Sequence, residues 1–169
     1  ADILIDSSDM TPHDLRAEVE RLIVPETGPR LAVSVNSFSY KRGLPRGMDM
    51  VLDCRFLRNP YWEPALRAMN GTSEEVATYV SQDPKFADFF DRVLGLVQML
   101  LPAYLEEGKS HFALGLGCTG GQHRSVAIAE KLTQALAEEG WQVSTRHREL
   151  ERGLRSASAV SPTSTASKV

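Results

Sequence analysis

Residues His111–Glu139 read HFALGLGCTGGQHRSVAIAEKLTQALAEE, and this stretch decides the fold class. An apolar run stops at Gly117, a glycine-bearing loop follows, and apolar residues then return at the spacing of a helix. This order predicts a strand, a loop and a helix. Because further short strands alternate with helical segments along the chain, we expect an α/β fold, a three-layer domain with a largely parallel sheet.

The loop between the predicted strand and helix carries the side chains that suggest a function. It consists of Cys118, Thr119, Gly120, Gly121, Gln122, His123, Arg124 and Ser125. A helix N-terminus offers unpaired N–H groups and a positive dipole end, and glycines let successive amides turn toward a phosphate. Arg124 adds a planar guanidinium that suits two oxygens of one phosphate. The loop therefore predicts an anion-binding site, most simply for a phosphate group.

A neighbouring strand adds side chains to the same edge of the predicted sheet. Met50–Leu52 is a short apolar run that predicts a strand, and Asp53 and Arg55 follow it. Ligand sites of parallel sheets form beyond the carboxyl ends of the strands, so we expect these two residues beside the loop.

A further strand is predicted over Leu31–Val35, followed by the polar and basic segment Asn36–Gly43. This segment has two interpretations. Either it contacts phosphate or bases, or it is a solvated loop with Phe38 and Tyr40 packed beneath it.

The spacing of Cys118 and Arg124 also matches C-x5-R-S, the signature of cysteine-dependent phosphatases. In that hypothesis the Cys118 thiolate attacks phosphorus, Arg124 holds the phosphoryl oxygens and Asp53 supplies the acid. Gly117 stands where the signature usually has histidine, which favours binding without catalysis. A purely structural interpretation also stays open, with Cys118 ending a strand and a tight turn after it. His123 is expected to contact phosphate, move a proton or cap the helix.

Composition sets the class of protein. The formal net charge of -3 does not by itself indicate nucleic-acid binding, and the two cysteines argue against a disulfide framework and for a reducing interior. No signal peptide or membrane-spanning run is recognisable, so we expect a cytoplasmic protein without membrane contact. Histidines and cysteines are too scattered for a metal site, and no cofactor is expected.

Other helices and strands follow from capping residues and periodicity. Ser73 is expected to cap a short helix, and a longer one is predicted from Asp83 to about Leu105, kinked or ended early by Pro102. Trp141–Thr145 predicts the last strand.

The ends of the chain predict additional units. Residues 1–24 contain a strand and a helix that we expect to belong to a preceding domain, with residues 25–30 as a linker. The segment 156–169, rich in serine, alanine and threonine, is expected to be disordered.

Three motifs in one order carry a family resemblance: VNSFSYKRGLP, DCRFLRNPYWEPALRAMNG and GCTGGQHRSVAIAEKL. They resemble the C-terminal domain of the RapZ family of bacterial RNase adapter proteins, which is expected over residues 31–155. Residues 1–24 are similar to the end of that family's N-terminal P-loop domain, and the nucleotide-binding glycine–lysine loop is absent from this chain. We therefore expect a piece of a longer protein, with any ATP or GTP hydrolysis belonging to the missing domain.

The resemblance implies a non-catalytic sensor of amino-sugar phosphates that binds small regulatory RNA, presents it to an endoribonuclease and self-associates. It implies glucosamine-6-phosphate as the ligand, surrounded by residues 118–125 with Asp53 and Arg55. Gln122 departs from the lysine often found in the family and removes a positive charge. A third hypothesis is an oligomerisation module for the absent domain. The residues available to the RNA backbone are Lys41, Arg42, Arg146, His147 and Arg148.

Overall fold

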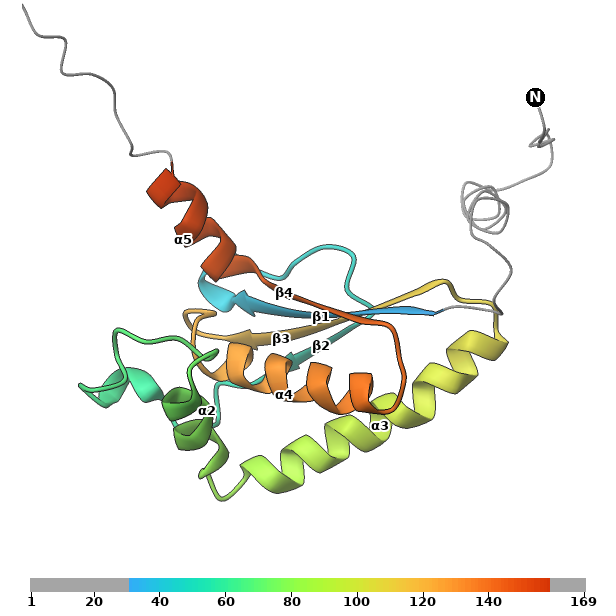
Figure 1. Cartoon of the computed structure of the whole chain (residues 1–169), viewed down its shortest axis with the longest axis horizontal. Helices are drawn as coiled ribbons and strands as arrows, with labels where there is room; N and C mark the ends of the chain where they lie inside the picture. The colour runs from blue at the N-terminus through green and yellow to red at the C-terminus, as the bar shows by residue number, and fades with distance from the viewer. Residues whose placement is uncertain (1–30, 159–169) are drawn as a thin grey trace, which may run out of the picture.

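The computed structural model describes residues 31–158 (Figure 1). One sheet holds four parallel strands in the order β2-β3-β1-β4. The strands are β1 (Ala32–Ser39), β2 (Met50–Asp53), β3 (His111–Cys118) and β4 (Val143–His147). The helices are α2 (Glu74–Ser81), α3 (Phe86–Glu106), α4 (Arg124–Glu138) and α5 (Arg148–Ser158), with 3-10 turns η1 (Tyr40–Arg42) and η2 (Pro60–Trp62). The predicted α/β class and largely parallel sheet are confirmed.

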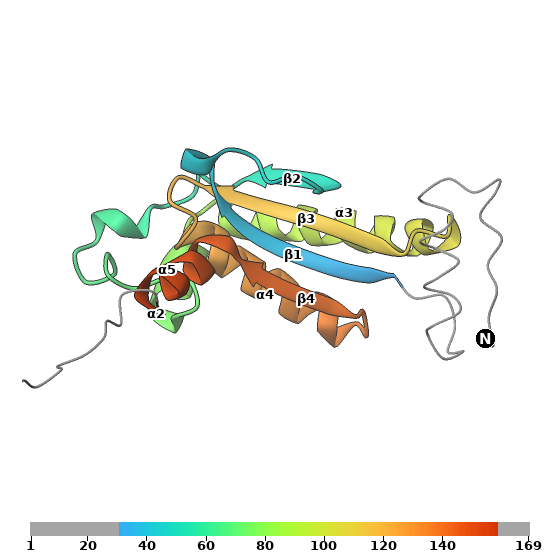
Figure 2. The same cartoon turned by 90° about the horizontal axis from the view of Figure 1, so that it is seen from above.

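The sheet is flanked by helices, in agreement with a three-layer domain (Figures 1 and 2). Helices α3 and α4 lie beneath the sheet in Figure 1, while α5 and the segment joining η1 to β2 rise on its other side. Parallel sheets are stable when both faces are shielded, because their strands are apolar on both sides. None of the helices within residues 31–158 has both the length and the apolar character needed to cross a membrane.

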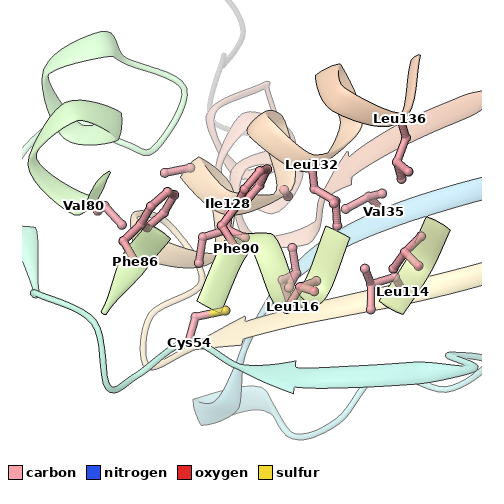
Figure 3. Close-up of a cluster of buried hydrophobic side chains, with 14 of the residues drawn as sticks. Val35, Cys54, Val80, Phe86, Phe90, Leu114, Leu116, Ile128, Leu132 and Leu136 are labelled. Atoms are coloured by element: carbon pink, nitrogen blue, oxygen red, sulfur yellow. The ribbon is translucent and has the colours of Figure 1, made fainter. Parts of the chain in front are cut away.

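The hydrophobic core lies between the sheet and helices α3 and α4 (Figure 3). Val35 of β1 pairs in register with Leu114 of β3, so both side chains point to the same face. The facing helices contribute side chains at helical spacing. Those labelled in Figure 3 include Phe86, Phe90, Ile128, Leu132 and Leu136. Each such side chain contributes about 1.5–3 kcal/mol when fully buried.

Three segments differ from the expectations. Strand β1 extends to Ser39, so residues 36–39 are a buried strand end and the expected solvated loop is wrong there. Phe38 is buried with its ring edge-on to Tyr40 at 5.0 Å, as the packing interpretation expects. Of the two expected effects of Pro102, an early end of α3 is wrong, since the helix continues to Glu106, close to the predicted end at about Leu105. Proline there lies in the last turns and removes one backbone hydrogen bond, while the fully buried Leu101 beside it keeps this part of the helix packed on the core.

The segment that follows α4 also differs from the expectation. β4 lies two residues later than predicted, because its register places Val143 beside Val33 of β1. The chain then forms α5, which the sequence interpretation missed and which includes residues 156–158 of the expected tail. The predicted elements of residues 1–30, and residues 159–169, lie outside the described part.

Candidate functional site

A cavity of about 660 Å³ opens at the carboxyl edge of the sheet, where the loop after β3 meets the turns that follow β1 and β2. Its size is typical of sites for small organic ligands, about 300–1,000 Å³. Six predicted ligand residues line it: Cys118, Thr119, Gly120, Gln122, His123 and Arg124. The other lining residues are Ser39, Lys41, Arg42, Asn59, Tyr61, Trp62 and Glu149.

Two backbone carbonyl groups of the loop accept hydrogen bonds from neighbouring segments, which hold the loop in place. The Ser39 hydroxyl donates to the carbonyl of Thr119 at 2.7 Å, and the Gly71 amide donates to the carbonyl of Gln122 at 2.8 Å. Gly121 has φ of 66°, and a Cβ there would lie 2.7 Å from the Ser39 nitrogen, so only glycine fits. The loop is therefore preorganised and needs little ordering to receive a ligand.

Part of the Arg124 guanidinium is already engaged within the protein. Its Nη1 donates to the carbonyls of Arg55 at 2.6 Å and Leu57 at 3.1 Å, and Nη2 donates to the Thr119 hydroxyl at 3.4 Å. The residue is 5% exposed, and within the described chain its buried Nε has no partner. An unpaired buried donor costs about 1–3 kcal/mol, so this N–H is suited to an acceptor brought by a ligand.

His123 precedes α4 and is also almost fully buried. Burial lowers its pKa, backbone hydrogen bonds to Met69 and Arg67 act in the opposite direction, and the Arg124 charge lowers it further. The imidazole is therefore neutral near pH 7. Its side chain makes no capping hydrogen bond, which excludes the capping interpretation, and its Nε2 lacks a partner within the described residues.

Asp53 and Arg55 do not line the cavity; they pair with each other. The Arg55 guanidinium donates to the Asp53 carboxylate at 2.6 Å and stacks 4.2 Å from the centre of the Tyr40 ring. The hydrogen bond from Arg55 lowers the pKa of Asp53, so this carboxyl is ionised at neutral pH and is poorly suited to act as a general acid.

The remaining loop positions support the cavity from behind. Gly121 and Ser125 do not line it, and Ser125 is fully buried with its hydroxyl 3.1 Å from the Cys118 sulfur. Cys118 lines the cavity but is only 2% exposed. With Asp53 outside the lining and the Arg124 Nη1 bound to carbonyl groups, this arrangement favours binding over phosphatase chemistry.

The five residues expected to meet RNA lie around the same edge. Lys41 and Arg42 line the cavity, and Arg148 lines an adjoining hollow of about 260 Å³ with Arg42. Arg146 is exposed and pairs with Glu151 at 2.9 Å. His147 instead points to α4, with its ring bonded to Ser37 at 2.9 Å and Glu130 at 2.6 Å. RNA contact by these residues stays a prediction.

The family model of the RapZ C-terminal domain matches residues 31–151. The chain belongs to this family. The resemblance drawn from three sequence motifs is thereby confirmed, and the match covers most of the part of the chain that the structure describes.

Relatives in other bacteria are similar over most of this chain. A nucleotide-binding protein of Cereibacter sphaeroides (strain KD131) is 63% identical over 163 residues, which is 96% of this chain and 54% of the relative. One of Ruegeria sp. (strain TM1040) is 66% identical over 150 residues, or 89% of this chain and 50% of the relative. The chain thus spans about half the length of the curated relatives it matches.

Sequence reasoning missed several lining residues of this RapZ C-terminal domain. Asn59, Tyr61 and Trp62 lie beside Pro60 and Pro64, in a loop to which the sequence assigns no function. Two adjacent aromatics soon after a strand end were the available signal. Glu149 gave none, because the helix that carries it was not predicted. Within residues 31–158, no group of three or more histidine, cysteine or acidic side chains is arranged to hold a metal ion.

Proposed function

We propose that this domain is a non-catalytic metabolite sensor that binds a phosphate-bearing small molecule at the Cys118–Ser125 loop. One observation carries the proposal. Arg124 Nε and His123 Nε2 are buried and unpaired within the described residues, and both side chains line the same cavity. Arg124 Nε would donate to a phosphate oxygen, and His123, whose other ring nitrogen is bonded to the backbone, would take up a proton at Nε2 on binding and donate to a second oxygen. Charge-assisted hydrogen bonds of this kind contribute about 1.5–3 kcal/mol each.

Glucosamine-6-phosphate is our candidate ligand. The family resemblance suggests an amino-sugar phosphate, and the charges around the cavity support this choice. Lys41, Arg42 and Arg124 suit the phosphate, while the Glu149 carboxylate in the same lining suits a ligand that also carries an ammonium group. A ligand with both charges uses both kinds of side chain.

The wider role in the proposal is that of an adapter. Small regulatory RNA would contact Lys41, Arg42 and Arg148 near the cavity and be presented to an endoribonuclease, so that ligand binding and RNA binding influence each other. Self-association through this domain belongs to the same proposal. Nucleotide binding, which is named for relatives about twice as long, is assigned to the part of them that lies beyond this chain.

The test is calorimetric titration with glucosamine-6-phosphate, using glucosamine and inorganic phosphate as comparators. Arg124→Lys and His123→Asn should each lower the affinity for the sugar phosphate about tenfold or more. Arg92→Ala is the matched control, because Arg92 lies on the exposed side of α3 and pairs with Asp88. Thermal melts verify folding, since Arg124 also holds the carbonyls of Arg55 and Leu57.

Undiminished binding in both variants, with the fold intact, would remove the loop from the proposal. Equal affinity for inorganic phosphate and the sugar phosphate would show that the site binds anions in general and does not recognise the sugar.

A further inference from the structure

Two exposed aromatic side chains line the cavity, and they differ in chemical character from the polar loop. Tyr61 is 49% exposed and Trp62 is 73% exposed, the most of any large hydrophobic side chain in residues 31–158. Both line the cavity together with His123 and Arg124. The cavity therefore combines donors for an anion with an apolar ring surface.

The turn that presents these rings is rigidly anchored. Asn59 Oδ1 accepts from the Tyr61 amide at 3.3 Å, the Trp62 amide donates to the Asn59 carbonyl at 3.2 Å, and Pro60 is buried. The Arg67 side chain fixes the turn from outside, since its Nε donates to the Tyr61 carbonyl at 2.9 Å. An aromatic side chain with a fixed backbone has only two torsions to order when it meets a ligand.

The two rings have different contacts within the protein. The Arg67 guanidinium lies 5.0 Å from the centre of the Tyr61 ring, so that ring already has a stacking partner. Trp62 meets Tyr61 edge-on, with ring centres 5.6 Å apart and planes at 79°. This T-shaped contact uses an edge of one ring and supports the indole in one orientation.

We propose that Trp62, braced by Tyr61, packs against the ring of the bound sugar phosphate and selects cyclic over acyclic phosphates. The inference rests on the proposed function and names the part of the ligand that the aromatic wall, formed by Tyr61 and Trp62, contacts. The carbon-bound hydrogens on one face of a pyranose form an apolar, slightly positive surface, which complements the negative face of an aromatic ring. An ammonium substituent on the sugar adds a cation–π attraction, for which tryptophan is the best partner.

The test compares Trp62→Ala and Trp62→Phe with the wild-type chain by calorimetry. The ligands are glucosamine-6-phosphate, glucose-6-phosphate, glycerol-3-phosphate as the acyclic phosphate, and adenosine monophosphate. We expect Trp62→Ala to lower the affinity for both hexose phosphates about 3- to 12-fold, with Trp62→Phe in between. Affinity for glycerol-3-phosphate should stay unchanged. Phe56→Ala is the matched control, because Phe56 is 46% exposed and does not line the cavity.

Fluorescence gives a second readout, because the chain has two tryptophans. Trp141 packs against the hydrophobic core and does not line the cavity, so a Trp141→Phe background isolates the Trp62 emission. A saturable change in that emission with glucosamine-6-phosphate, at the concentrations found by calorimetry, is expected. The same titration of Trp62→Phe should show no such change.

The possible outcomes distinguish the sensor function of the domain from the role of Trp62 in it. If the wild-type chain binds hexose phosphates and Trp62→Ala binds them equally well, the aromatic wall is overturned while the sensor function stands. An equal loss for hexose phosphates and glycerol-3-phosphate also overturns it, since the tryptophan would then support the loop alone. If adenosine monophosphate binds as tightly as the hexose phosphates, the aromatic side chains stack on a nucleobase and the proposed selection of sugars is overturned. Absence of binding by every phosphate compound overturns the sensor and the wall together.

Discussion

Arg42 donates through Nε to Glu149 Oε2 at 3.1 Å, joining the turn after β1 to the first turn of α5. Both residues line the cavity, and Glu149 is the less exposed partner at 11% against 60%. The pair therefore places a carboxylate beside an anion loop and occupies a cation that the proposed function assigns to RNA. Neutralising Glu149 changes both at once.

Glu149→Gln should tighten the binding of inorganic phosphate, because it removes a negative charge from the lining and releases Arg42. At the effective dielectric of a partly exposed site the gain is about 1 kcal/mol or less, or up to about fivefold in affinity. The preference for glucosamine-6-phosphate over glucose-6-phosphate should shrink in the same variant. Calorimetry with the three ligands tests this, and an unchanged preference would separate Glu149 from recognition of the amino group.

Gly117→Ala should destabilise the fold by about 1–3 kcal/mol through overpacking. A Cβ at this position would lie 2.4 Å from the Tyr40 ring and 2.5 Å from the Phe38 ring. The same contacts explain why no larger residue precedes Cys118. Gly95→Ala in α3 is the matched control, since a Cβ there meets nothing within 4 Å and should stabilise the helix by about 0.5–1 kcal/mol. Urea denaturation measures both, and equal effects would refute the packing argument.

The buried His123 should make stability depend on pH. Its pKa in the folded chain lies below the usual 6.5, mainly because of burial, so the unfolded chain binds the proton more readily. Stability is therefore full above about pH 6.5 and falls as the pH drops toward the folded pKa, by at most about 1.4 kcal/mol per pH unit. Urea denaturation at pH 7.5 and 5.5 should show a smaller loss in His123→Asn than in the wild-type chain. Identical losses would contradict a depressed pKa.

Lys41→Ala should weaken the proposed binding of RNA in a way that depends on salt. Each phosphate neutralised contributes roughly 0.7–0.9 to the slope of log affinity against log salt, so the slope should fall by about that amount. Arg92→Ala should keep the wild-type slope, because Arg92 is exposed on α3, pairs with Asp88 and does not line the cavity. Fluorescence anisotropy with a labelled stem-loop RNA over a salt series measures this. A slope unaffected by Lys41→Ala would exclude the residue from the RNA contact.

The strand, loop and helix around Gly117 were predictable because their signals are local. Apolar spacing distinguishes a strand from a helix within a few residues, and a loop that starts a helix has few alternative conformations. Local reasoning predicts no helix after β4, where α5 forms from a charged segment. The pairs Arg42–Glu149 and Arg146–Glu151 support α5 in the folded chain, and neither follows from the local pattern alone.

The position of the loop between β3 and α4 was likewise predictable, whereas the contacts of its individual side chains were not. The sequence predicts that the Arg124 guanidinium contacts two oxygens of one phosphate, yet its Nη1 holds the carbonyls of Arg55 and Leu57. Those carbonyls lie almost seventy residues earlier in the chain, so no spacing rule relates them to Arg124.

By itself the sequence determined the α/β class, the family and the loop that ends β3, since each depends on residues close together in the chain. The tertiary structure alone decided which distant segments share the cavity with that loop. It brought Trp62 from the turn after β2 and Glu149 from α5 to one edge of the sheet, and it turned Asp53 and Arg55 toward each other. The physical reason is that parallel strands end at a common edge, so their following segments meet in space whatever their separation in sequence.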